Sequence, residues 1–194
     1  MKNQIQFVSD FHTMKKYMRD YPFHPALNRF REAKEQQEAL LATLEKGSRI
    51  CIATDKDWIV GYTLILDPEE NERWRALPYI KVLGAIEVAP TYRSEGIAKK
   101  LLQGICDEPQ IEQFIILSIE YAWHWDLRMV DGDIQLYKAL LKRLLQTQQF
   151  NETVTDDPDV AQYKHNFMMA RYGDRVSSDQ INQFMRLANM NTIY

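Results

Sequence analysis

The sequence contains little cysteine and little histidine. Its 194 residues include two cysteines and four histidines. Cys51 and Cys106 fall in a predicted strand and a predicted helix, so we expect two buried, reduced thiols rather than a disulfide. The histidines stand far apart, and none has a cysteine or a second histidine at the spacing of a zinc site. The sequence therefore predicts no metal.

Long apolar runs and a strong charge of one sign are missing as well. No stretch approaches the roughly 20 apolar residues that cross a bilayer, and residues 1–6 lack the apolar core of a signal peptide. With 24 basic and 27 acidic side chains the net charge is −3, which offers no general surface for nucleic acid. Since 45% of the residues are hydrophobic, the chain can bury a substantial core. We expect a cytoplasmic globular protein that binds neither nucleic acid nor membrane.

The most informative stretch is a predicted strand, turn and helix. Residues 83–89 are apolar and partly alternating, and Pro90 prevents further ladder pairing. The segment 93–98 then leads into a helix, where its free backbone N–H groups and the partial positive charge of the helix end suit a phosphate. Gly96 lets an anion approach closely. The apolar face of the helix is formed by Ile97, Leu101, Leu102 and Ile105.

This turn resembles the pyrophosphate loop of the GNAT family of N-acetyltransferases. Arg93, Gly96 and Ala98 match the pattern R/Q-x-x-G-x-G/A, and the surrounding strand and Leu-Leu helix match the family's context. The alternative is an ordinary strand, turn and helix that binds nothing. The resemblance implies acetyl-CoA as the co-substrate. Its cofactor-binding residues would be Val88, Arg93, Ser94, Glu95, Gly96, Ile97, Ala98 and Lys99.

The order of predicted elements agrees with that fold. A strand, a helix and a second strand across the turn imply a right-handed crossover and parallel pairing, after an antiparallel meander. We expect an α+β GNAT fold: a mostly antiparallel sheet with one splayed parallel strand pair and flanking helices. Residues 1–194 would form one domain that includes segments 1–47 and 160–194. The predicted strands are 2–8, 49–53, 58–66, 83–89, 114–119, 150–155 and 166–171; the helices are 11–18, 26–45 with Gly47 as C-cap, 97–106, 134–146 and 178–187 with Ser178 as N-cap; 67–78 is a charged loop and 155–158 a turn.

Several segments are similar to the acetoin-utilisation branch of this family. They read IEVAPTYR at 86–93, EYAWHWDL at 120–127, TDDPD at 155–159 and MMARYGDRVS at 168–177. Members of that branch acetylate a lysine of acetyl-CoA synthetase and thereby inactivate that enzyme. The resemblance therefore implies a protein-lysine acetyltransferase of acetate and acetoin metabolism.

Acetyl transfer to lysine requires a group that removes a proton. The free lysine pKa is about 10.4, so the amine must be neutralised before it attacks a thioester. Glu87 is the first candidate, because on a strand it would be the one acid on a face shared with Ala85 and Ala89. Glu120 is the second: it ends the apolar run 114–119 and could hold a water or anchor the lysine. Either carboxylate could instead be purely structural.

The remaining site residues come from the family resemblance and from the aromatic segment after Glu120. The N–H of Val88 would stabilise charge on the thioester oxygen, and Tyr137 or Tyr121 could protonate the leaving thiolate. Direct release of the thiolate, assisted by the positive loop, is the alternative. His124 could be a base or a structural histidine bonded to Asp126. Trp123 and Trp125 could be core or rim aromatics, which we favour, or platforms for the substrate. This segment would form a wall of the substrate groove, with Tyr121, His124 and Trp125 binding the substrate.

Two other functions remain open at this level. The usual family spacing around the tyrosine is absent, and Glu95 departs from the usual loop composition. Both features are compatible with a non-catalytic acyl-CoA sensor. A small-molecule amine could also replace the protein lysine as acceptor, and the sequence leaves a homodimer open.

Overall fold

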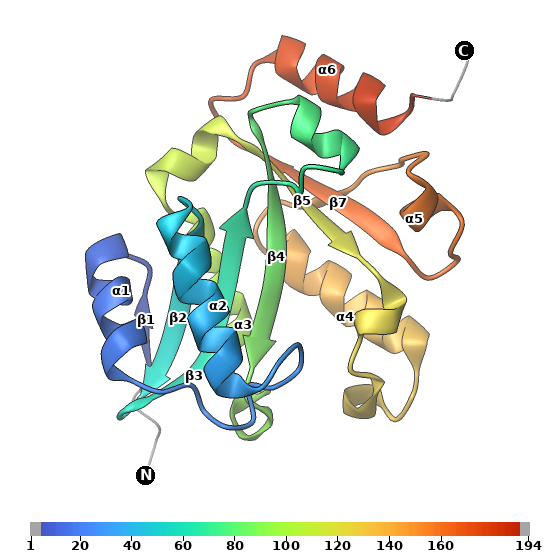
Figure 1. The fold of residues 1–194 in the computed structure, drawn as a ribbon. Coiled ribbons are helices and arrows are strands. Elements are labelled where there is room, and N and C mark those ends of the chain that lie inside the picture. The colour runs from blue at the N-terminus through green and yellow to red at the C-terminus, as the bar shows by residue number, and fades with distance from the viewer. Residues whose placement is uncertain (1–4, 191–194) are drawn as a thin grey trace. The chain divides into compact units, whose positions relative to one another are not determined.

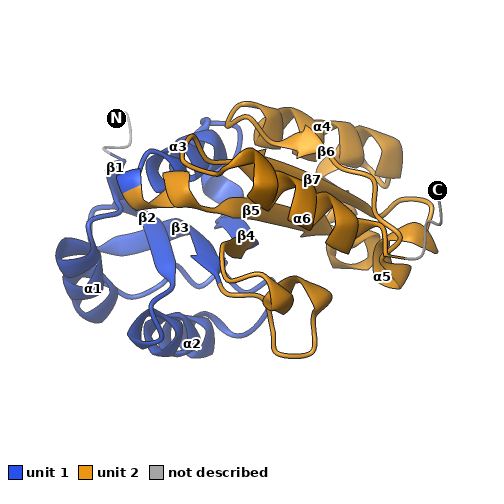
Figure 2. Ribbon diagram, turned by 90° about the horizontal axis from the view of Figure 1, so that it is seen from above, with its two compact units in different colours: residues 1–66, 83–109 blue, residues 67–82, 110–194 orange. Residues whose placement is uncertain are grey.

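Residues 5–190 are described by the structure, which is a computed structural model (Figure 1). The chain divides into two compact units, each described here by itself (Figure 2). Unit 1 is Met1–Leu66 with Leu83–Pro109, and unit 2 is Asp67–Val82 with Gln110–Tyr194. That residues 1–194 form a single domain stays a prediction.

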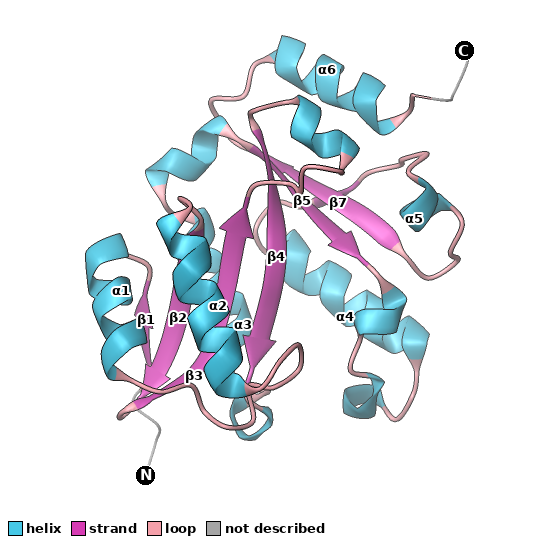
Figure 3. Ribbon diagram, viewed as in Figure 1, coloured by secondary structure: helices cyan, strands magenta, loops and turns pink. Residues whose placement is uncertain are grey.

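Figure 3 shows the helices and strands of the two units. One strand, β4 (Ile80–Val88), contributes its first residues to unit 2 and the rest to unit 1. The other elements of unit 1 are β1 (Gln6–Val8), α1 (Phe11–Asp20), α2 (Ala33–Glu45), β2 (Arg49–Asp55), β3 (Trp58–Leu66) and α3 (Ile97–Cys106). The other elements of unit 2 are β5 (Ile115–Glu120), α4 (Ile134–Gln146), β6 (Asn151–Glu152), α5 (Pro158–Ala161), β7 (Phe167–Tyr172) and α6 (Ser178–Ala188).

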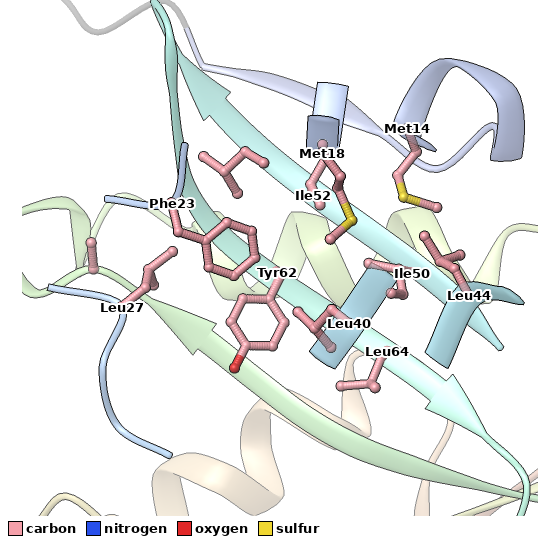
Figure 4. Packing of buried hydrophobic residues seen from close by; sticks show 12 residues of the cluster. Met14, Met18, Phe23, Leu27, Leu40, Leu44, Ile50, Ile52, Tyr62 and Leu64 are labelled. Carbon is pink, nitrogen blue, oxygen red and sulfur yellow. The ribbon is translucent and has the colours of Figure 1, made fainter. Parts of the chain in front are cut away.

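Unit 1 is a sheet with helices on both faces. Helices α1 and α2 cover one face, and α3 covers the other (Figure 2). Because side chains alternate along a strand, Ile50 and Ile52 of β2 lie on the face that packs against α1 and α2, together with Tyr62 and Leu64 of β3 (Figure 4). Cys51 lies between the two isoleucines in sequence, and its side chain is buried on the opposite face, toward α3. Its sulfur would lie 3.0 Å from a Cβ added to Gly104 of that helix. Because helices cover both faces of this sheet, β2 and β3 are largely apolar on both sides.

Unit 2 is built on the antiparallel strands β5 and β7. Their paired residues run from Ile115 with Tyr172 to Glu120 with Phe167. Phe184 and Ala188 of α6 belong to the core cluster on one face of this pair. The Phe167 side chain points to the other face, where it lies beneath the ammonium groups of Lys138 and Lys142 from α4. Among residues 5–190, no helix combines the length and hydropathy that a membrane span requires.

The predicted fold class is confirmed. Seven strands are hydrogen-bonded in the order β1-β2-β3-β4-β5-β7-β6, and the β4–β5 neighbours are parallel. Three residue pairs form this parallel ladder, from Ile80 with Ile115 to Val82 with Leu117. Beyond that point each strand continues without further pairs in this ladder, as a splayed pair does.

The predicted helix 26–45 is wrong in its first part, because α2 begins at Ala33. The Ala26 N–H donates to Nδ1 of His24, and the Arg29 N–H donates to Oε1 of Glu87. Leu27 is fully buried in the unit 1 core. Side-chain acceptors and burial therefore satisfy this segment better than the helical conformation that its composition favours.

Other boundaries differ by smaller amounts. The N-cap of α6 is Ser177 rather than Ser178, and it forms a capping box with Gln180. Strand β6 covers only Asn151–Glu152 of the predicted strand 150–155. Residues 2–4 of the first predicted strand lie outside the described residues. A helix, α5, begins inside the predicted 155–158 turn.

Two local predictions have contrasting outcomes. Gly47 follows α2 with a φ of +89°, which confirms it as the helix-terminating glycine. The bounds of α4 are also as predicted, but its apolar side is not fully covered, since Leu136 and Leu140 are 47% and 44% exposed while Leu145 is buried.

Candidate active site

The loop before α3 has the geometry of an anion site. Ser94 and Gly96 both adopt left-handed backbone conformations, with φ of +68° and +73°. Gly96 is the N-cap of α3, and nothing lies within 4 Å of the position that a Cβ would occupy there. The first N–H groups of a helix have no acceptor within it. The loop therefore offers backbone donors, open space and the positive end of a helix to a phosphate.

Charged side chains flank this loop. The Arg93 Nε donates to the carbonyl oxygen of Val88 at 3.1 Å, which ties the arginine to the end of β4. Glu95 and Lys99 are exposed, so the carboxylate of Glu95 reaches solvent. The ammonium of Lys100 lies 5.4 Å from the centre of the Phe7 ring. This cation–π contact joins α3 to β1.

Glu87 lies within unit 1 in a buried hydrogen-bond network. The residue is 6% exposed, and its Oε2 accepts a bond of 2.7 Å from the Tyr62 hydroxyl. Its Oε1 accepts the backbone N–H of Arg29 at 3.0 Å. Gln36 Nε2 donates to the Tyr62 oxygen at 3.1 Å. Burial, and then the charge of Glu87, raise the pKa of Tyr62, so this hydroxyl stays protonated and donates.

Two residues that the sequence did not predict, Tyr62 and Gln36, belong to the network around Glu87. Tyr62 is 25 positions from Glu87 and Gln36 is 26 from Tyr62, and no local pattern links such positions. The signal that could have found Tyr62 was a hydroxyl-bearing residue within the otherwise apolar β3. A buried tyrosine hydroxyl usually needs a partner, and Glu87 was a lone acid on a neighbouring strand.

Glu120 lies in unit 2 and is partly exposed. Its Oε1 accepts the Ser118 hydroxyl at 2.8 Å. Desolvation raises the pKa of the Glu120 carboxyl, and the Ser118 hydroxyl and the Trp125 indole oppose this rise. Trp125 Nε1 is buried with no acceptor within hydrogen-bond distance among the described residues. Among the described residues, the Ser118 hydroxyl is the hydrogen-bond donor to this carboxyl.

Trp125 connects Glu120 with a further predicted residue. The ring of Tyr137 stacks on the Trp125 ring with centroids 5.4 Å apart and an angle of 22° between planes. Phe167 packs against the same indole at 6.0 Å. The structure thus gathers Glu120, Trp125 and Tyr137 within unit 2, and Trp125 is a core aromatic that is 7% exposed.

The neighbouring aromatic residues reach the surface of unit 2. Tyr121 stacks on Trp123 with centroids 4.9 Å apart, and His124 meets both rings edge-on at 5.9 Å. Trp123 is 54% exposed, so it is a rim residue. Asp126 is buried and accepts two bonds, of 2.7 and 3.1 Å, from the Arg128 guanidinium. The predicted bond between His124 and Asp126 stays a prediction.

Within residues 5–190 no group of three or more histidine, cysteine, aspartate or glutamate side chains is arranged to hold a metal ion. Cys51 and Cys106 are buried thiols, and burial, followed by the Glu108 charge, raises the pKa of Cys51 to about 12. The predicted reduced, buried thiols are therefore confirmed.

A family model of acetyltransferases, the acetyltransferase (GNAT) family, matches residues 11–121 of the chain. The chain belongs to the GNAT family. Acetoin utilization protein AcuA of Bacillus subtilis is 40% identical over 86% of this chain and 81% of its own length. The AcuA protein of Bacillus licheniformis is 38% identical over 87% and 81%. This GNAT protein falls in the acetoin-utilisation branch.

Solved structures agree with this assignment. An acetoin utilization protein from Exiguobacterium sibiricum superposes with a TM-score of 0.86 at 31% identity, covering 98% of this chain and 96% of that one. YncA, an acetyltransferase from Salmonella typhimurium solved with its cofactor acetyl-CoA, shares the fold at a TM-score of 0.55 and 15% identity over 88% and 94%. As a GNAT N-acetyltransferase, the chain uses acetyl-CoA as co-substrate.

Proposed function

We propose that this N-acetyltransferase acetylates a lysine of a partner protein of the acetyl-CoA synthetase type. The observation that carries the proposal is the left-handed, open loop before α3 in a chain 38–40% identical to acetoin utilization proteins. When bound, acetyl-CoA supplies an acetyl group activated as a thioester. The buried, reduced thiols of Cys51 and Cys106 suit the cytoplasm, where we place the reaction.

Backbone groups of the loop would hold the cofactor. The N–H groups from Ser94 to Lys99 lie at or next to the N-terminus of α3, where a pyrophosphate is favoured. Arg93 would add positive charge from the end of β4, and the Val88 N–H would face the thioester oxygen. The members of this proposed set are Val88, Arg93, Ser94, Glu95, Gly96, Ile97, Ala98 and Lys99.

Glu87 would accept the proton of the attacking amine. Both of its oxygens already act as acceptors, and a carboxylate retains room for a further donor such as a water. Tyr62 and the Arg29 N–H would fix its orientation. A positioned base of this kind allows the amine to attack the thioester directly.

Residues of unit 2 would handle the acceptor. The Glu120 carboxyl, beside the buried Trp125 N–H, would anchor the lysine or a water, and the Tyr137 hydroxyl would donate to the leaving thiolate. Tyr121, His124 and Trp125 would form the surrounding wall. Each of these roles is part of the proposal.

The decisive experiment is a reaction of the purified protein with acetyl-CoA and purified acetyl-CoA synthetase. We expect release of coenzyme A thiol, a gain of one acetyl group in the intact mass of the synthetase and loss of synthetase activity. Thiol release with small amines but not with the synthetase would replace the protein acceptor by a small molecule. No release with any amine, despite stabilisation by acetyl-CoA, would identify a sensor.

A glycine pair tests the loop. Gly96→Ala and Gly47→Ala introduce the same side chain at left-handed positions of unit 1, with φ of +73° and +89° and no atom within 4 Å of the new Cβ. Each should cost about 1 kcal/mol of folding stability. We expect only Gly96→Ala to weaken acetyl-CoA binding, by about tenfold or more, in isothermal titration calorimetry. Equal affinities of the two variants would contradict the loop assignment.

A further inference from the structure

Unit 2 exposes a small group of aromatic side chains, which we call the aromatic platform: Tyr121, Trp123 and Tyr163. Tyr121 and Trp123 are stacked at 4.9 Å with 15° between their planes, and Tyr163 meets Trp123 edge-on at 5.1 Å. Trp123 and Tyr163 are 54% and 51% exposed. Large aromatic side chains are usually covered in a monomer, and exposed clusters mark interaction sites.

Asn166 connects the two chain segments that carry the platform. This buried asparagine accepts the Ala122 N–H at 2.9 Å, and its side-chain amide donates to the Asp159 carbonyl at 2.6 Å. Its own backbone N–H donates to the carbonyl of Tyr163 at 3.0 Å. One side chain thus joins the turn that carries Trp123 to the segment that carries Tyr163. A surface organised before binding loses little entropy when a partner docks.

The electrostatic surroundings of the platform are acidic. The pKa of Tyr121 is raised to about 12. Burial is the largest cause, and the negative charges of Asp157, Asp159 and Glu72 are the next causes. Arg73 pairs with Asp157 at 3.2 Å and also with Asp156, so it offsets part of this charge. The exposed Asp159 and the partly exposed Glu72 keep the local field negative.

We propose that the aromatic platform and the Asp159 carboxylate dock a basic segment of the protein substrate, through lysine or arginine side chains that flank the acceptor lysine. Aromatic faces attract ammonium and guanidinium groups, and the neighbouring carboxylates attract the same cations while repelling phosphate-bearing or acidic partners. Tyr121 directly follows Glu120, the proposed lysine anchor, so docking would begin where β5 ends. This inference rests on the proposed protein-lysine acceptor and names the chemistry that selects it.

The test uses two fluorescein-labelled synthetic peptides. Each has one central lysine, flanked either by arginines or by glutamates, and binding to the full chain is followed by fluorescence anisotropy with and without acetyl-CoA. We expect the arginine peptide to bind more tightly than the glutamate peptide. Its affinity should fall about tenfold in Trp123→Ala and about threefold in the isosteric Asp159→Asn. Added salt should weaken its binding as well.

Trp58→Ala provides the matched control, because Trp58 is a 39% exposed tryptophan in unit 1 outside the platform. It should bind the arginine peptide as the wild type does. Thermal melts of all three variants exclude unfolding as the cause of lost binding. Equal binding of the two peptides, undetectable binding of both, or unchanged binding by Trp123→Ala and Asp159→Asn would overturn the inference.

Turnover separates this inference from the proposed function. If the arginine peptide binds through Trp123 but is never acetylated, the platform stands and the lysine-acetyltransferase proposal fails. If the peptide is acetylated with the same KM by the wild type and Trp123→Ala, the proposed function stands and the platform inference fails. A KM raised in Trp123→Ala with kcat retained supports both.

Discussion

The two units each contain a candidate carboxylate, and the two are held in different ways. In unit 1, Glu87 accepts a tyrosine hydroxyl and a backbone N–H, one on each oxygen. In unit 2, Glu120 has one hydroxyl donor, and desolvation is the largest influence on its pKa. The indole N–H of Trp125 has no hydrogen-bond partner among residues 5–190.

The difference shows that burial alone does not determine the chemistry of a carboxylate. Hydrogen-bond donors favour its charged form, whereas removal from water disfavours that form. Glu87 is therefore built as a fixed acceptor, and Glu120 as a group that gains from a cation arriving beside it. Four predictions test this contrast, in decreasing order of expected effect.

The largest effect should come from Glu87→Gln. An amide keeps the shape of the side chain but cannot take a proton, so kcat should fall about 100-fold or more with little change in acetyl-CoA affinity. Glu120→Gln should instead raise the KM for the acceptor by about tenfold, because it removes an anchor for the lysine. Steady-state kinetics with calorimetry distinguishes the two. Reversed effects would exchange the roles of the two carboxylates.

The second effect concerns glycines that allow close approach. A Cβ on Gly173 in unit 2 would lie 2.3 Å from the Glu112 carbonyl oxygen, whereas one on Gly61 in unit 1 would lie 3.0 Å from that of Glu87. Backbone cannot move aside as a side chain can, so Gly173→Ala should cost about 3 kcal/mol of unfolding free energy and Gly61→Ala about half as much. Urea denaturation gives both values. A smaller cost at Gly173 would mean that its segment moves away from Glu112.

The third effect tests the network around Glu87. Tyr62→Phe removes the hydroxyl between Gln36 and Glu87 and leaves buried polar groups without a partner, which should cost about 1–3 kcal/mol of stability. Tyr17→Phe in the same unit removes only a 3.5 Å exposed contact with Gln6 and should change stability by less than about 0.5 kcal/mol. Comparable losses in both variants would show that the network is not rigid.

The smallest effect is a pH dependence of stability. Because the pKa of Glu120 is raised in the folded protein, the unfolded chain loses this proton first as the pH rises. Folding stability should therefore decrease between the ordinary glutamate pKa and the raised one, and stay lower at neutral pH. Glu120→Gln does not ionise at this position and so does not lose this stability. The melting temperature of the variant minus that of the wild type should therefore be larger at pH 7–8 than at pH 4. A constant difference across pH would contradict the desolvation of Glu120.

Local sequence accounted for much of the fold. The stripe Ile97, Leu101, Leu102 and Ile105 is buried in α3, and both ends of α4 match the prediction. The start of α2 could not be predicted, because the donors of residues 26–29 find acceptors on His24 and on the distant Glu87. Helical propensity is a weak preference that such contacts override.

In the candidate site, too, some features could be predicted from the sequence and others could not. The loop Arg93–Ala98 was visible as a motif, since a strand, a glycine and a helix start are consecutive in the chain. Glu87 was visible as a lone acid on an apolar strand, but its partner Tyr62 was not, and neither was the contact of Trp123 with Tyr163, 40 positions away. Periodicity describes neighbours along the chain and carries no information on which distant side chains meet.

The sequence by itself determined the strand-turn-helix, the apolar faces and the family resemblance, because each depends on residues that are close in the chain. Only the tertiary structure decided which carboxylate is satisfied by hydrogen bonds, which is desolvated, and which tryptophan is buried or exposed. Desolvation and side-chain pairing depend on packing between segments far apart in sequence, and packing is established only when the chain folds.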